Sequence, residues 1–137
     1  SHLEFYDKME TKPDIVITCI GYLDDQKNSE QNFEETKTSI YSNYLGLISI
    51  LNIISSDFEK KNAGVIVGIS SVAGDRGRAS NYIYGSAKAG FTAYLSGLRS
   101  RMSARNVKVI TVKPGFIDTK MTKDLNLPKF LTASSEA

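Results

Sequence analysis

Tyr84 and Lys88 are the pair of residues best suited to acid/base chemistry in this sequence. They lie four residues apart inside a helical pattern, and this spacing places both side chains on one face of a helix. A free phenol, with a pKa of roughly 10, is a poor proton donor or acceptor at neutral pH. A nearby ammonium favours the phenolate, so the pairing predicts a lowered pKa for Tyr84 and a general acid/base for a carbonyl oxygen. Without further context, the same spacing fits a half-buried tyrosine beside a solvated lysine.

Two more polar residues could take part in the same chemistry. Ser71 precedes Tyr84 by thirteen residues and ends an apolar run, so its hydroxyl could hydrogen-bond the same carbonyl oxygen. Asn43 lies inside a long helical pattern, where a residue of low helix propensity needs a specific reason. Both residues matter only if the fold brings them toward Tyr84.

Five segments of regular structure are expected to position these residues. Short β-branched runs predict buried strands over residues 14–20, 64–70 and 107–115. Apolar residues at steps of three and four predict helices over residues 33–61 and 81–105. This order predicts an α/β fold with three parallel strands and two long helices, the βαβαβ half of a Rossmann-like, doubly wound parallel sheet. Two helices cannot easily cover both faces of three apolar strands, so we expect neighbouring strands and helices to be missing from this chain.

The predicted sheet brings three polar segments to one edge. In open α/β sheets, ligands bind in the crevice beyond the carboxyl ends of the strands. Those ends carry residues 18–21 (TCIG), residues 70–71 (SS) and residues 114–119 (PGFIDT). We therefore expect these segments to face a common site.

Three motifs resemble the short-chain dehydrogenase/reductase family: YGSAK (84–88), ISSVAG (69–74) and PGFIDTKM (114–121). The resemblance covers essentially residues 14–125, and the family's catalytic Asn, Ser, Tyr and Lys are carried here by Asn43, Ser71, Tyr84 and Lys88. It implies that Tyr84 exchanges a proton with the substrate oxygen while Ser71 holds that oxygen. Lys88 would lower the pKa of Tyr84 and bind the nicotinamide ribose, and the backbone at Asn43 would hold a water that links Lys88 to solvent.

The resemblance also implies a cofactor, NAD or NADP, and a small-molecule carbonyl/alcohol substrate. The family segment that contacts the nicotinamide carboxamide is matched by Pro114, Gly115, Ile117 and Thr119, and Tyr84 and Lys88 would contact the cofactor as well. Where the family usually has Asn-Asn-Ala-Gly, this chain keeps only Gly21, which lets the backbone approach the cofactor. No metal site is expected.

Several family features are expected to precede residue 1: the Gly-rich phosphate loop, the first three strands and the residue that selects NAD or NADP. Residues 1–14 look like the end of an amphipathic helix without a helix start. We expect residues 1–137 to be the C-terminal catalytic half of a single Rossmann-type oxidoreductase domain, and this fragment to be inactive alone. With the strand at 14–20 left at an open edge and no Gly-rich turn, the isolated chain should neither bind the dinucleotide tightly nor form a stable monomer.

Composition excludes several other classes of protein. The chain has 137 residues, of which 41% are hydrophobic and 23% charged, as in a soluble globular domain, and no apolar run is long enough for a membrane span. The net charge is only +2 and the basic residues are scattered, which argues against nucleic acid as a partner. A single cysteine excludes an internal disulfide and, with no secretory segment in view, favours the cytoplasm.

Two alternatives to a reductase or dehydrogenase remain open. An extended-branch nucleotide-sugar epimerase or dehydratase also uses Tyr-x-x-x-Lys, but the thirteen-residue gap after Ser71 and the PGFIDT segment disfavour it. A non-catalytic binding relative usually loses the tyrosine or the lysine, and both are present here.

Two surface features could define partners. Arg76 and Arg78 lie between Ser71 and Tyr84 and could receive a phosphate or another anion, or be solvated or paired with surface carboxylates. A stripe of small residues, Ser86, Gly90, Ala93 and Gly97, would permit close helix packing. We therefore expect a homo-oligomer built on the helices over 33–61 and 81–105.

Overall fold

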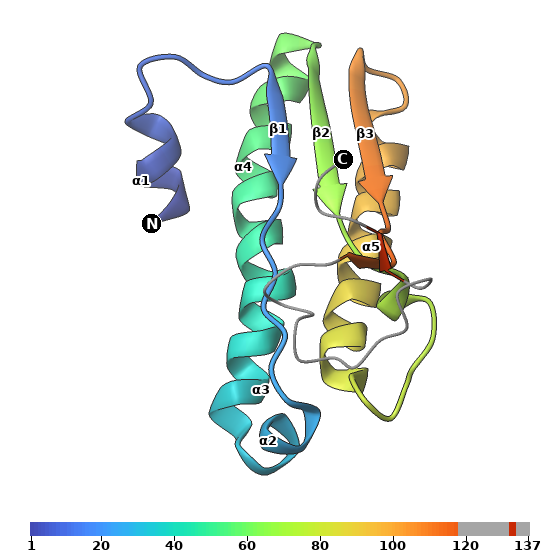
Figure 1. Ribbon diagram of the computed structural model, residues 1–137. Coiled ribbons are helices and arrows are strands. Elements are labelled where there is room, and N and C mark those ends of the chain that lie inside the picture. The colour runs from blue at the N-terminus through green and yellow to red at the C-terminus, as the bar shows by residue number, and fades with distance from the viewer. Residues whose placement is uncertain (118–131, 134–137) are drawn as a thin grey trace.

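The computed structural model describes residues 1–117 and 132–133, and its centre is a parallel sheet (Figure 1). Strands β1 (Ile15–Thr18), β2 (Gly64–Ile69) and β3 (Val107–Val112) lie in the order β1-β2-β3. The predicted α/β fold with three parallel strands is confirmed. Each strand is shorter than its predicted run, and residues 19–20, 70 and 114–115, which follow the carboxyl ends of the strands, line the site described below.

Helices and short turns connect these strands. They are α1 (His2–Asp7), α2 (Gln26–Gln31), α3 (Phe33–Ile40), the π-helical segment η1 (Tyr41–Leu45), α4 (Gly46–Lys61), the 3-10 turn η2 (Val72–Gly74) and α5 (Tyr82–Met102). Beyond β3, β4 (Phe116–Ile117) pairs in parallel with β5 (Thr132–Ala133). The single helix predicted over 33–61 is thus divided by η1, and the helix predicted over 81–105 is α5.

Two helices differ from the expectation from sequence. The polar stretch before Phe33 contains α2, whose N-cap Asp25 accepts hydrogen bonds from the backbone N–H groups of Lys27 and Asn28. The amino-terminal helix is shorter than the amphipathic stretch expected over residues 1–14 and ends at Asp7, with Ser1 Oγ accepting from the Glu4 backbone N–H in its first turn. The phenol of Tyr6 in that helix donates to Asp57 Oδ2 at 2.7 Å, and this bond fastens α1 to α4.

The core lies between one face of the sheet and α4 and α5, which run behind the strands in Figure 1. Its fully buried side chains include Leu47, Leu51, Phe58, Ile66, Phe91 and Leu95. Gly68 of β2 lies so close to α5 that an added Cβ would overlap the side chain of Leu95. The helix and the strand therefore pack closely where β2 approaches the site.

The opposite sheet face is open among the described residues. Ile15 and Ile17 of β1 are 61% and 60% exposed, and Ile110 and Val112 of β3 are exposed too. The prediction of strands buried on both faces is therefore wrong for this part of the chain. The opposite face is exposed because the two long helices, α4 and α5, both lie on one face of the sheet. This agrees with the expectation from sequence that two helices would not cover both faces. Along the described residues, no helix combines the length and the apolar character needed to cross a bilayer.

Candidate active site

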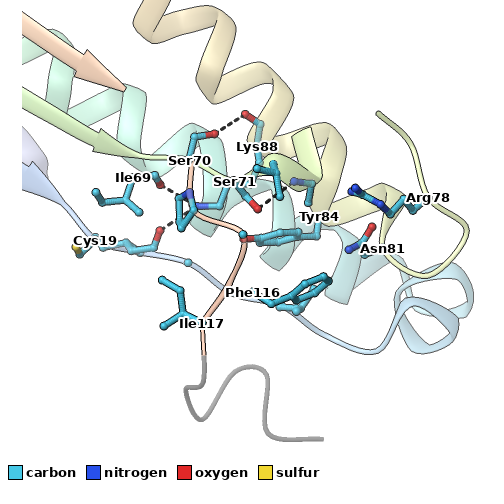
Figure 2. Close-up of a pocket in the computed structure, with 17 residues that line it drawn as sticks. Cys19, Ile69, Ser70, Ser71, Arg78, Asn81, Tyr84, Lys88, Phe116 and Ile117 are labelled. Carbon is cyan, nitrogen blue, oxygen red and sulfur yellow. Dashed lines mark hydrogen bonds between the residues drawn. The ribbon is translucent and has the colours of Figure 1, made fainter. Parts of the chain in front are cut away.

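A cavity of about 490 Å³ lies beyond the carboxyl ends of the strands (Figure 2). Its walls come from the segments that follow β1 and β2, from η2, from the first two turns of α5 and from residues 114–117. Seven residues singled out from the sequence line it: Gly21, Ser71, Tyr84, Lys88, Pro114, Gly115 and Ile117. Asn43 is not part of the lining, and Thr119 lies outside the described residues. The common site expected at the strand ends is present.

Lys88 joins α5 to the ends of two strands. Its side chain is buried, and its Nζ donates hydrogen bonds to the backbone oxygens of Ile20 and Ile69, each at 3.3 Å. Burial lowers the pKa of Lys88, while the nearby Cys19 acts in the opposite direction. An ammonium has three donors, and these two carbonyls use two of them. One donor therefore remains for a group inside the cavity.

Tyr84 lies one helical turn before Lys88, with the Lys88 Nζ 5.7 Å from the centre of its ring. Burial raises the pKa of Tyr84, and hydrogen bonding by the Ser71 side chain acts to lower it. The net shift of the Tyr84 pKa is therefore upward, opposite to the lowered pKa expected from the sequence. The cost of burying a phenolate outweighs the opposing effect of the Ser71 hydrogen bond. Tyr84 is consequently a neutral phenol at neutral pH.

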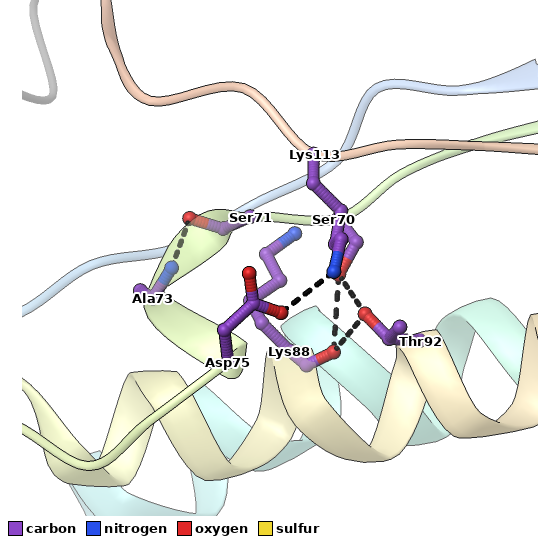
Figure 3. A network of polar contacts seen from close by, with 7 residues as sticks. All are labelled: Ser70, Ser71, Ala73, Asp75, Lys88, Thr92 and Lys113. Carbon is purple, nitrogen blue, oxygen red and sulfur yellow. Dashed lines mark hydrogen bonds and ion pairs between the residues drawn. The ribbon is translucent and has the colours of Figure 1, made fainter.

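Ser71 is held at the start of η2, where its Oγ accepts a hydrogen bond from the backbone N–H of Ala73 at 3.1 Å. The preceding residue, Ser70, is buried, and its hydroxyl bonds the backbone oxygen of Lys88 and the Thr92 hydroxyl, at 3.0 and 2.7 Å (Figure 3). This network fastens the end of β2 to α5 and so sets Ser71 against the face that carries Lys88. Sequence reasoning gave Ser70 no role, although a buried serine ending an apolar strand needs a partner.

An ion pair fixes the other side of the same loop. Lys113, just after β3, contacts Asp75 Oδ1 at 2.7 Å, as Figure 3 shows. The pair joins the end of β3 to the residue that follows η2. The loop that carries Ser71 is thereby attached to both α5 and β3.

Asn43 shapes the site from outside the cavity. Its fully buried amide donates to the backbone oxygens of Tyr22 and Ser39 at 2.6 and 2.9 Å, and its Oδ1 accepts from the Tyr22 N–H at 3.1 Å. These bonds hold the segment after β1, which includes Gly21, against the π-helical turn η1. Short π segments inside α-helices are frequent at functional sites. The side chain therefore explains why a poor helix former stands here.

Arg78 and Asn81 also line the cavity, whereas the exposed Arg76 does not. Asn81 occupies the N-cap position of α5 without capping it through its side chain. Its buried Oδ1 has no hydrogen-bond partner among the described residues. Across the same residues, no cluster of three or more His, Cys, Asp or Glu side chains could hold a metal ion.

Comparison with known proteins gives consistent matches. The family model described as short chain dehydrogenase matches residues 3–129. An uncharacterized oxidoreductase of Mycobacterium tuberculosis is 32% identical over 109 residues, which are 80% of this chain and 44% of that protein. A 3-oxoacyl-(acyl-carrier-protein) reductase of Chlamydia trachomatis is 31% identical over 113 residues, which are 82% of this chain and 46% of the relative. The chain thus spans about half the length of the curated relatives it matches.

A solved structure shares the fold. The crystal structure of a short chain dehydrogenase from Burkholderia cenocepacia in complex with NADP has a TM-score of 0.83 and 23% identity. The alignment covers 96% of this chain and 56% of that one. Together with the family match over residues 3–129, the parallel sheet and the Ser, Tyr and Lys that share its cavity show that this chain belongs to the short-chain dehydrogenase family.

Proposed function

We propose that this chain is the catalytic half of an NAD(P)-dependent oxidoreductase, which transfers a hydride between a nicotinamide cofactor and a small carbonyl or alcohol. The observation that carries the proposal is the meeting of Ser71, Tyr84 and Lys88 in one cavity at the strand ends. Because the curated relatives are about twice as long, we propose that residues 1–137 form the C-terminal part of one Rossmann-type domain.

The walls of the cavity fit the nicotinamide end of NAD or NADP. Gly115 has open space where a side chain would be, and Pro114 and Ile117 add apolar surface next to it. Gly21, Pro114, Gly115 and Ile117, with Thr119 further on, would hold the nicotinamide, and Lys88 would offer its remaining donor to the ribose. When bound, the reduced cofactor supplies the hydride that adds to the carbonyl carbon.

The chain's own residues would manage the proton. Tyr84, a neutral phenol, would donate its hydroxyl proton to the carbonyl oxygen, which the Ser71 hydroxyl would hold by a second hydrogen bond. The phenolate left behind would be stabilised by the Lys88 ammonium, 5.7 Å from the ring centre. A water on the backbone at Asn43 would return a proton from solvent through Lys88. Because its phenol is protonated at neutral pH, Tyr84 is in the state that proton donation during carbonyl reduction requires.

The exposed apolar surface of α3 and η1 supports assembly into a homo-oligomer. Phe33, Tyr41 and Leu45 are 71%, 59% and 44% exposed and line a shallow groove together with Lys37. On α5, Ser86, Ala93 and Gly97 of the small-residue stripe are exposed, which leaves room for close packing of another helix. We propose an oligomer built on the helical segments 33–61 and 81–105. Light scattering of the full-length protein tests it, and a strict monomer at micromolar concentration would contradict it.

The test of the catalytic proposal is Tyr84→Phe in the full-length protein, with Tyr82→Phe as the matched control. Tyr82 lies on the same helix but is exposed and does not line the cavity. We expect Tyr84→Phe to lose roughly a hundredfold to ten-thousandfold in carbonyl reduction with an unchanged circular dichroism spectrum, and Tyr82→Phe to keep its rate. Lys88→Ala should lose nearly as much as Tyr84→Phe. Near wild-type turnover by Tyr84→Phe would refute the mechanism.

The cytoplasmic location stays a prediction, which cell fractionation tests.

A further inference from the structure

Arg78 and Asn81 form a polar wall of the cavity that the proton chemistry of Ser71, Tyr84 and Lys88 does not use. In Figure 2 they lie on the side of the cavity opposite Cys19, with the Tyr84 ring between. Arg78 belongs to the loop between η2 and α5, and Asn81 immediately precedes the first turn of α5. This wall therefore borders the space that a substrate would occupy beyond Tyr84.

Among the residues that the structure describes, none neutralises the positive charge of Arg78. No described residue forms an ion pair with the Arg78 guanidinium. The carboxylate nearest to it in sequence, Asp75, is already paired with Lys113. The cavity-lining residues within 1–117 include no aspartate or glutamate. A partly buried guanidinium without a counter-charge favours an incoming anion, and its planar donors suit carboxylate or phosphate oxygens.

Asn81 offers the complementary polar group. Its Oδ1 is buried and unpaired among the described residues, and a buried acceptor without a donor is unfavourable. Tyr84 follows Asn81 by three positions, so the two lie about one helical turn apart. A hydroxyl on the substrate, placed a few bonds from the reacting carbonyl, could donate to this oxygen.

We propose that Arg78 binds an anionic group of the substrate and that Asn81 accepts a hydrogen bond from a substrate hydroxyl. The substrate class is then a carbonyl compound, or the corresponding alcohol, that carries a further hydroxyl group and a carboxylate or a phosphate. This inference rests on the proposed oxidoreductase function and adds the class of substrate to it. The two sources of negative charge share the same recognition chemistry, and the experiment separates them.

The experiment measures reduction of matched charged and neutral carbonyls by the full-length protein with NADH and with NADPH. The phosphate arm compares dihydroxyacetone phosphate with dihydroxyacetone, and the carboxylate arm compares glucuronate with glucose. We expect wild type to prefer the charged member of one arm by roughly tenfold to a hundredfold in kcat/KM. Arg78→Ala should abolish that preference through KM, Arg78→Lys should restore part of it, and the matched control Arg76→Ala should leave it unchanged. Asn81→Ala should lower kcat/KM for the charged, hydroxylated substrate without changing the KM of the cofactor.

Three results would overturn the inference. These are no charge preference in wild type in either arm, an equal loss on charged and neutral members in Arg78→Ala, or an effect of Arg78→Ala confined to the KM of the cofactor. If wild type reduces none of the four compounds, equilibrium titration with inorganic phosphate and with glucuronate decides. Binding of phosphate or glucuronate that is lost in Arg78→Ala and kept in Arg76→Ala would support the anion site. The missing turnover would then count against the proposed oxidoreductase function only. Turnover without dependence on Arg78 would leave that function intact and refute this inference.

Discussion

Gly85→Ala tests whether the close contact between η2 and α5 positions Ser71 against Tyr84. A Cβ added to Gly85 would lie 2.7 Å from the backbone oxygen of Ala73, closer than real Cβ atoms approach an oxygen. That distance has to open beyond 3.0 Å, and the displaced atom is backbone of η2, two residues from Ser71. Alanine at this position should therefore move Ser71 away from the phenol.

Gly97→Ala on the same helix is the matched control, because nothing in the described chain lies within 4 Å of the position that an added Cβ would take. Since Gly97 belongs to the stripe proposed for assembly, both variants are compared at the same oligomeric state. Replacing glycine by alanine inside a helix stabilises by about 0.5–1 kcal/mol, and this gain is common to both variants. Overpacking costs about 1–3 kcal/mol and applies only to Gly85. The two variants should thus differ in free energy of unfolding by about 1–3 kcal/mol, with Gly97→Ala the more stable.

Urea unfolding followed by circular dichroism measures the stability difference, and carbonyl reduction by the full-length protein measures the effect on the site. A misplacement of about 1 Å can cost roughly a hundredfold in rate, so we expect Gly85→Ala to lose at least about tenfold in kcat while Gly97→Ala keeps its rate. Equal stability and equal turnover of the two variants would refute the idea that this contact positions Ser71.

Three other predictions follow from the same geometry. Asn43→Ala removes three hydrogen bonds, two part-buried ones to Tyr22 and a buried one to Ser39, and should cost about 3 kcal/mol at about 1 kcal/mol each. Urea unfolding measures this cost against the exposed Asn52→Ala, and a cost below that of Asn52→Ala would contradict the proposed role of the Asn43 side chain. Because burial raises the pKa of Tyr84, the phenol stays protonated over the neutral range, so reduction should be level from about pH 6 to about pH 9 and fall only above the ordinary value of 10.0. A fall in rate between those limits would come from deprotonation of Tyr84 or of Lys88, whose pKa burial lowers, and would contradict the level profile. Titration of the isolated 137-residue chain with NADH and NADPH should give no tight binding, and micromolar binding by a monomer with a cooperative melt would be the contrary outcome.

Local patterns predicted much of the site correctly. The four-residue spacing of Tyr84 and Lys88 places them on one face of α5, and the strand ends at Gly21, Ser71 and Pro114 meet in one cavity. Both results follow from rules that need no knowledge of distant contacts, namely the helical repeat and the common direction of parallel strands. The existence of α2 was missed because it depends on a single capping residue, Asp25, within a polar stretch.

The chain sequence by itself determined the order of strands and helices, the edge of the sheet where the site lies and the residue types available there. Only the tertiary structure decided the state of those residues, because burial and hydrogen bonds between distant segments are absent from local periodicity. Lys88 donates to the carbonyls of residues 20 and 69, which are distant in sequence, and burial by the surrounding segments raises the pKa of Tyr84. In the same way, packing of the loop after η2 placed Arg78 in the cavity wall and left Arg76 in solvent, although the two differ by only two positions in sequence.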